Sequence, residues 1–166
     1  MKKIIIILFV ISSIYLFSNK DEIIIPKESI RFRIIANSNS IEDQALKNNI
    51  KNDLINNVIP NTIDNSYENT KEMVNNAIPK IDESLQKYNV NYDINFGNNY
   101  FPKKTYKGIT YPEGNYESLV ITIGDGVDNN FWCVMYPPLC LIDEGNNTSN
   151  IEYRTLAQEL IEKYNK

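Results

Sequence analysis

Residues 130–140 read Asn130-Phe131-Trp132-Cys133-Val134-Met135-Tyr136-Pro137-Pro138-Leu139-Cys140, and they hold the chain's only tryptophan, both of its cysteines and its one Pro-Pro pair. The apolar residues before the prolines predict a buried strand. Proline fixes φ and has no N–H to donate to a sheet, so we expect the strand to end at Tyr136–Pro138. A fully extended chain would hold Cys133 and Cys140 roughly 23 Å apart, whereas the Cα atoms of a disulfide lie about 5.5 Å apart. The chain therefore has to reverse at the prolines if the two thiols are to meet.

The composition predicts one globular domain that does not bind nucleic acid. The chain has 166 residues, 42% hydrophobic and 23% charged, which leaves room for a domain of roughly 120–140 residues behind a separate N-terminal segment. A net charge of −4 and a pI near 4.9 argue against a protein that binds phosphate backbones. Histidine is absent, which excludes histidine-dependent nucleophilic sites and His-ligated zinc, and two cysteines cannot form a four-thiolate zinc site. We expect no metal and no cofactor.

The N-terminus has the pattern of an export signal. Met1-Lys2-Lys3 is followed by the uncharged, mostly apolar segment Ile4–Phe17. As a helix this segment would measure about 21 Å, which is short of a hydrocarbon core of roughly 30 Å. We therefore predict a signal peptide or signal anchor over residues 1–19, a spacer over residues 20–28, and an exported domain over residues 29–166.

Export bears on the two cysteines, for which two interpretations stay open. Outside the cytoplasm, Cys133 and Cys140 are expected to form a disulfide. Closing so short a loop would stabilise the fold by roughly 2–3 kcal/mol in the chain-entropy model. The alternative is a pair of buried, unreacted cysteines.

The first half of the domain predicts one strand and two helices. Alternating apolar residues predict a strand over Ser29–Ala36, with Arg31 and Arg33 on its second face. Ser40 is a predicted N-cap, with Asp43 as its capping-box partner, for a helix that ends before Pro60. A second helix is expected over residues 67–88, kinked at Pro79.

The second half predicts strands, turns and a last helix. The expected strands cover residues 90–96, 104–111 (a weaker edge strand), 116–123 and 131–136, with turns over residues 97–102 and 112–114. Asp125-Gly126 is a candidate hairpin turn between the last two strands. Ser149 is expected to cap a helix over residues 151–164. This order predicts a single α+β domain, an antiparallel-rich sheet of about four to five strands with helices packed on it, behind an N-terminal hydrophobic signal or anchor helix.

Arginine is scarce, and two of the three arginines share one face of the first strand. Arg31 and Arg33 precede the amide-rich turn Asn37-Ser38-Asn39 at a helix N-terminus. One hypothesis is a recognition face, because the guanidinium fork suits carboxylates. The other is an internal network in which an arginine pairs with Asp43 or Glu42.

The remaining motifs do not indicate a catalytic or ion-binding site. Gly124-Asp125-Gly126 does not continue as a phosphate-binding or EF-hand motif and is expected to be a hairpin loop. The acidic residues show no close pairing that favours acid–base catalysis, so we predict no catalytic residues. Trp132 is interpreted either as core packing against the disulfide or as a binding hot spot.

Three blocks, in order, carry a family resemblance. They are Ile30-Arg31-Phe32-Arg33-Ile34-Ile35-Ala36-Asn37-Ser38-Asn39-Ser40 with Glu42-Asp43-Gln44-Ala45-Leu46-Lys47, then Tyr111-Pro112-Glu113-Gly114-Asn115-Tyr116-Glu117-Ser118-Leu119, then Trp132-Cys133-Val134 through Pro137-Pro138-Leu139-Cys140. Over residues 29–143 the chain closely resembles the stage II sporulation protein R family of endospore-forming Firmicutes.

The resemblance implies a signal rather than an enzyme. Members are made in the forespore and exported into the space between the forespore and mother-cell membranes. There they are required to activate a membrane-embedded aspartic-type protease that processes the sigma-E precursor. The candidate receptor interface is Arg31, Arg33, Asn37, Ser38, Asn39, Trp132, Tyr136, Pro137, Pro138 and Leu139. The alternative function is an exported cell-wall hydrolase or lytic factor that uses carboxylates.

Overall fold

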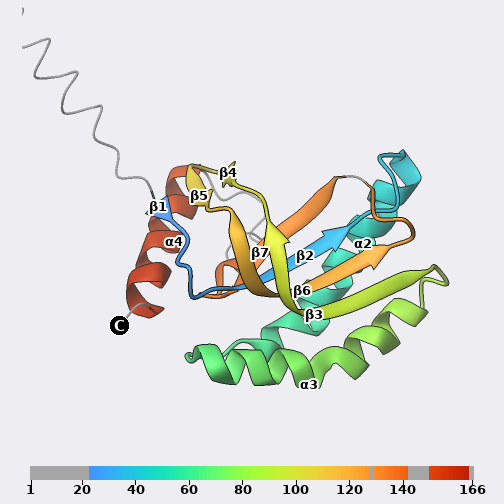
Figure 1. Cartoon of the computed structure of the whole chain (residues 1–166), viewed down its shortest axis with the longest axis horizontal. Helices are drawn as coiled ribbons and strands as arrows, with labels where there is room; N and C mark the ends of the chain where they lie inside the picture. The colour runs from blue at the N-terminus through green and yellow to red at the C-terminus, as the bar shows by residue number, and fades with distance from the viewer. Residues whose placement is uncertain (1–22, 128, 142–149, 165–166) are drawn as a thin grey trace, which may run out of the picture.

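The computed structural model describes residues 23–127, 129–141 and 150–164, and it is built around a four-stranded mixed sheet (Figure 1). The strand order is β3-β6-β2-β7. The strands are β2 (Ile30–Ile35), β3 (Tyr92–Phe101), β6 (Gly114–Ile123) and β7 (Asn130–Tyr136). Strand β2 runs parallel to β6 and antiparallel to β7, while β3 pairs antiparallel with β6. Strand β7 is thus an edge strand of this sheet.

Two helices cover one face of the sheet. Helix α2 (Ile41–Asn57) is followed by the short 3₁₀ helix η1 (Ile59–Thr62) and by helix α3 (Tyr67–Gln86), which continues through Pro79. The alternating residues Ile30, Phe32 and Ile34 of β2 pack against these helices in the main hydrophobic cluster. Strand β2 and helices α2 and α3 thus form where the sequence predicts one strand and two helices.

A second, smaller sheet packs with the C-terminal helix. Its order is β1-β5-β4, where β1 is Ile23–Ile24, β4 is Lys104–Tyr106 and β5 is Ile109–Tyr111. Strand β1 is parallel to β5, and β4 and β5 form an antiparallel hairpin. Helix α4 (Asn150–Tyr164) follows η2 (Leu139–Leu141) along the chain. Figure 1 shows β1, β5 and α4 side by side, and side chains from all three share one hydrophobic cluster.

Several predicted boundaries were wrong. The presumed spacer, residues 20–28, supplies β1, and Ile25 behind it is buried. The expected turn over residues 97–102 is instead a continuation of β3, because the Gly97 backbone pairs with Ser118 and the strand runs to the buried Phe101.

The sheet pairing also differs from expectation. The predicted edge strand over residues 104–111 is a hairpin, whose turn residues Lys107 and Gly108 both have positive φ. The proposed hairpin at Asp125-Gly126 does not form, because β2 lies between β6 and β7. The expected single sheet is therefore two mixed sheets, and each contains a parallel pair.

Parts of the sequence prediction lie outside the described residues. These are the signal segment over residues 1–19 and the Ser149 cap. Within the described ranges, no helix has the length and apolar character needed to cross a membrane. In α4, Ala157 and Ile161 are buried, whereas Leu156 is exposed.

Candidate functional site

The face of the main sheet opposite α2 and α3 carries cations and aromatic rings. Side chains alternate along a strand, so Arg31 and Arg33 point away from the helix-covered core that Phe32 enters. Phe101, Tyr116 and Val120 form the buried cluster on this face, with Trp132 packed against it. The site is therefore built from neighbouring strands of one sheet.

Arg31 lies inside this cluster and not on a recognition surface. Its side chain is 1% exposed, and its guanidinium carbon lies 3.4 Å from the Tyr116 ring centroid and 5.3 Å from that of Phe101. None of its three guanidinium nitrogens has a hydrogen-bond partner within the described part of the chain. Burial lowers the pKa of Arg31, and the nearby Tyr116 opposes that effect. Arg31 is therefore not part of an exposed recognition face. It does not pair with Asp43 either, because that carboxylate accepts hydrogen bonds from Asn37 and Ser38.

Arg33, two residues further along β2, is half-buried at the edge of the cluster. It pairs across the strands with Trp132, and its guanidinium carbon lies 5.6 Å from the Trp132 ring centroid and 5.9 Å from that of Phe101. Burial lowers its pKa. Arg33 and Trp132 are thus brought together as neighbours, as an interface on this face would require.

Trp132 does not pack against the cysteine pair. It follows Phe131 and precedes Cys133 on β7, so it points to the opposite face from Cys133, which belongs to the helix-covered cluster. Its ring makes an edge contact with Phe101, with centroids 5.1 Å apart. The expectation that Trp132 covers the disulfide is wrong because the two side chains alternate.

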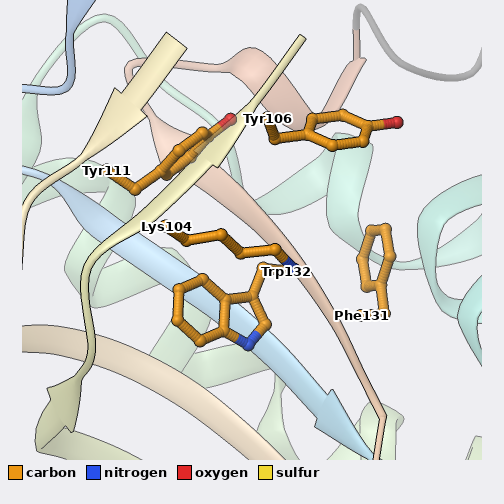
Figure 2. A pocket seen from close by; sticks show the side chains of 5 residues that line it. All are labelled: Lys104, Tyr106, Tyr111, Phe131 and Trp132. Carbon is orange, nitrogen blue, oxygen red and sulfur yellow. The ribbon is translucent and has the colours of Figure 1, made fainter. Parts of the chain in front are cut away.

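A pocket lies along the β7 edge (Figure 2). It has a volume of about 130 Å³ and is lined by Lys104, Tyr106, Tyr111, Phe131 and Trp132. In Figure 2, Trp132 and Phe131 lie on the two sides of β7, and the Lys104 side chain extends over the indole. The Lys104 ammonium is 4.8 Å from the Trp132 ring centroid. The β4–β5 hairpin thus supplies one wall and the edge strand the other.

Further cations surround the pocket. Lys51 of α2 lies with its ammonium 5.5 Å from the Phe131 ring centroid. Burial, then the charge of Arg33, lowers the pKa of Lys104. Burial also lowers the pKa of Lys47, followed by the charges of Lys104 and Lys51. These mutual effects indicate a local concentration of positive charge.

The turn before α2 has a structural role. Ser40 caps the helix as predicted, accepting a hydrogen bond from the Asp43 N–H at 3.1 Å. The Asp43 carboxylate does not complete the predicted box; it accepts from Asn37 Nδ2 at 2.9 Å and from Ser38 Oγ at 2.5 Å. These bonds, led by that from Ser38, lower the pKa of Asp43.

The same turn holds the β6–β7 loop. Asn37 Oδ1 accepts from the Asp125 N–H at 3.0 Å, and Asn39 Oδ1 accepts from the Asn129 N–H at 3.1 Å. Lys47 donates to the Asn129 carbonyl at 3.2 Å. The amides proposed as receptor contacts are thus occupied in fixing a loop.

The cysteine pair is a disulfide. Cys133 and Cys140 are bonded, with Cα atoms 5.1 Å apart. Strand β7 ends at Tyr136, and the chain reverses at Pro137 and Pro138, as predicted from the sequence. Of the two open interpretations, the structure selects the bridge.

The turn formed by these prolines offers little surface. Pro137, Pro138 and Leu139 are buried in the described structure, which corrects the idea that they present contact area. Tyr136 is half-buried between Tyr67 and Tyr164, with ring centroids 5.7 Å and 5.4 Å away. The ten predicted interface residues therefore do not form one surface.

Comparison with known proteins assigns the chain to a family. The family model described as "Stage II sporulation protein R (spore_II_R)" matches residues 26–146. The chain belongs to the stage II sporulation protein R family. It is 37% identical over 136 residues to stage II sporulation protein R of Bacillus subtilis (strain 168), an alignment that covers 78% of this chain and 61% of that protein. No solved structure matches the chain.

The segment that matches the stage II sporulation protein R family contains the main sheet, the disulfide and every residue of the pocket. Four pocket residues were missed at the sequence level: Lys104, Tyr106, Tyr111 and Phe131. The signal available in the sequence was Gly108, because glycine marks tight turns. In the structure, Lys107 and Gly108 form the hairpin turn that places Lys104 opposite Tyr111.

Proposed function

We propose that this protein is an exported sporulation signal. It is made in the forespore, crosses the forespore membrane, and is required to activate the mother-cell membrane protease that processes the sigma-E precursor. The family match over residues 26–146 carries the proposal. The Cys133–Cys140 bridge supports an oxidising location, since disulfides persist outside the cytoplasm.

The protein acts by binding. A ligand shifts a receptor's equilibrium only by the difference between its affinities for the active and inactive states, and about 1.4 kcal/mol of difference gives a tenfold shift. A domain with a bridged edge strand and packed helices presents a fixed surface suited to that role. Of the predicted interface residues, Arg33 and Trp132 lie together at a pocket, and we place the receptor contact there.

The test is genetic, in the organism that carries this chain. Deleting its coding sequence is expected to leave the sigma-E precursor unprocessed during sporulation, as followed by immunoblot. Expression of the full chain in the forespore restores processing. The matched control, which lacks residues 1–22, is expected to accumulate inside the forespore without restoring it. Normal processing in the deletion strain contradicts the proposal.

The cell-wall alternative is tested separately with the purified chain. Incubation with peptidoglycan is expected to release no soluble fragments. Release that depends on one of the carboxylates would instead establish a hydrolase.

A further inference from the structure

The pocket at the β7 edge concentrates positive charge on an acidic protein. The chain as a whole carries a net charge of −4. Yet Arg33, Lys104 and Lys51 each lie within 6 Å of the Trp132 or Phe131 ring centroid, at 5.6, 4.8 and 5.5 Å. Lys47 is close enough to Lys104 and Lys51 for their charges to lower its pKa. Among the residues that the structure describes, the charge gathered here is opposite in sign to the net charge of the chain.

Within the described part of the chain, Lys104 and Lys51 contact aromatic rings and form no ion pair with an acidic residue. Among the described residues, the ion pair joins Lys71 to Glu117 on a different surface, and it includes neither Lys104 nor Lys51. Rings attract cations through their quadrupole, by about 0.5–1 kcal/mol at exposed sites. That attraction fixes the position of the ammonium groups without neutralising them. Their charge is therefore available to an anionic group.

The size of the pocket limits what enters it. Pockets for small molecules and cofactors usually measure about 300–1,000 Å³, and this one measures about 130 Å³. It has space for a single side chain. Aromatic walls from Tyr111, Phe131 and Trp132 favour an apolar stem, and Tyr106 at 41% exposure leaves the rim accessible.

We propose that this pocket captures one acidic side chain, glutamate or aspartate, carried beside apolar residues on an exposed segment of a protein partner. Lys104 meets the carboxylate, and Trp132 and Phe131 pack against the neighbouring apolar groups. The identity of that partner as the sporulation protease rests on the proposed function, whereas the binding chemistry does not.

The only tryptophan of the chain lies in the pocket, so its fluorescence reports occupancy directly. The probes are two peptides, acetyl-Leu-Glu-Leu-amide and acetyl-Leu-Gln-Leu-amide, titrated into the purified full chain. The glutamate peptide is expected to give a saturable change in Trp132 emission with an affinity about tenfold or more above that of the glutamine peptide. Equal affinities overturn the proposal.

Substitutions at two neighbouring lysines test whether Lys104 binds the carboxylate. Lys104→Met is expected to weaken binding of the glutamate peptide about tenfold or more, whereas Lys103→Met, at an exposed neighbour outside the pocket lining, leaves it unchanged. Lys104→Arg keeps the charge and is expected to retain binding. Circular dichroism checks that each variant is folded. Equal losses in Lys103→Met and Lys104→Met, or loss of binding in Lys104→Arg alone, contradict the assignment.

Two further probes distinguish other anions. Inorganic phosphate that displaces the peptide at equal concentration shows a general anion site and overturns the proposal. The proposal is also overturned if the chain binds phosphatidylglycerol vesicles and Lys104→Met abolishes that binding, because the surface would then recognise a membrane. Restoration of sigma-E precursor processing is scored for Lys104→Met in parallel. If the wild-type chain binds the glutamate peptide but Lys104→Met still restores processing, the binding site stands and its role in the proposed function fails.

Discussion

Arg31 is the least expected residue of the domain. It is one of the largest fully buried side chains, yet its guanidinium faces rings and has no hydrogen-bond partner in the described structure. Removing a charge from water costs several kcal/mol, and even a desolvated cation–ring contact returns only about 2 kcal/mol. Arg31 therefore contributes volume to the core more than favourable electrostatics.

Replacing this charge by an apolar side chain of similar length tests that balance. We expect Arg31→Met to raise the free energy of unfolding by about 1 kcal/mol, because the packing is kept and the buried charge is removed. Arg31→Ala, which leaves a cavity, is expected to lower it by about 2–5 kcal/mol. Urea unfolding followed by circular dichroism measures both. A large loss in Arg31→Met would show that the guanidinium has an anionic partner.

Asp43 provides a pH-dependent contribution to stability. Its hydrogen bonds from Ser38 and Asn37 favour the charged form, so its folded pKa lies below the value in the unfolded chain. The contribution is therefore complete above the ordinary aspartate pKa of about 3.9, and it is lost as the pH falls through the lower folded pKa.

The corresponding variant is Asp43→Asn. It is expected to have a lower urea midpoint than the wild type at neutral pH, and the gap should close in acid. Glu42→Gln, which removes the other first-turn charge outside the network, is the control and is expected to lower the urea midpoint less than Asp43→Asn does. A gap of constant size across the acid range would mean that the carboxylate charge is not what the network stabilises.

At the scale of elements, the β6–β7 loop depends on the turn before α2. Gly124 follows β6 with φ of 57°, in the left-handed region, and a Cβ there would overlap the Asn37 amide. The same Asn37 oxygen accepts the Asp125 N–H. Loop and turn are thus coupled through a contact that has no room for a side chain.

A matched pair of glycine substitutions measures this coupling. Gly124→Ala is expected to lower the free energy of unfolding by about 2 kcal/mol or more, from the left-handed backbone and the displaced Asn37. Gly97→Ala in β3, where a Cβ would meet nothing within 4 Å, is expected to be neutral or slightly stabilising. Comparable urea midpoints for the two variants would contradict the coupling.

The elements that the sequence predicts well are those with regular periodicity. The predictions of β2, α2 and α3 depend on local spacing alone, and all three elements formed. Strand pairing depends on partners far along the chain, so the insertion of β2 between β6 and β7 was missed. The same distinction applies to the residues of the pocket. Trp132 was proposed from composition, whereas Lys104 reaches the pocket only through a hairpin of the second sheet.

For the molecule as a whole, β7 connects all of the buried regions. Trp132 enters the arginine-containing face, Cys133 and Met135 enter the cluster beneath the helices, and Val134 enters the cluster of the second sheet. The disulfide then ties the middle of this strand, at Cys133, to Cys140, beside the buried Leu139. This continuity predicts that the small second sheet unfolds together with the main one.

The segment before β2 provides the test, since it belongs to the second sheet although its sequence suggested a spacer. Ile25 is 1% exposed and packs in the second cluster, whereas Ile24 is 51% exposed. Ile25→Ala in the full chain is expected to lower the free energy of unfolding by about 2–4 kcal/mol, and Ile24→Ala by less than about 0.5 kcal/mol. Because one cooperative unit is expected, far-ultraviolet circular dichroism and Trp132 emission should shift together in Ile25→Ala. A shift in neither signal, or an early transition in only one of them, would show that β1 is not part of the cooperative domain.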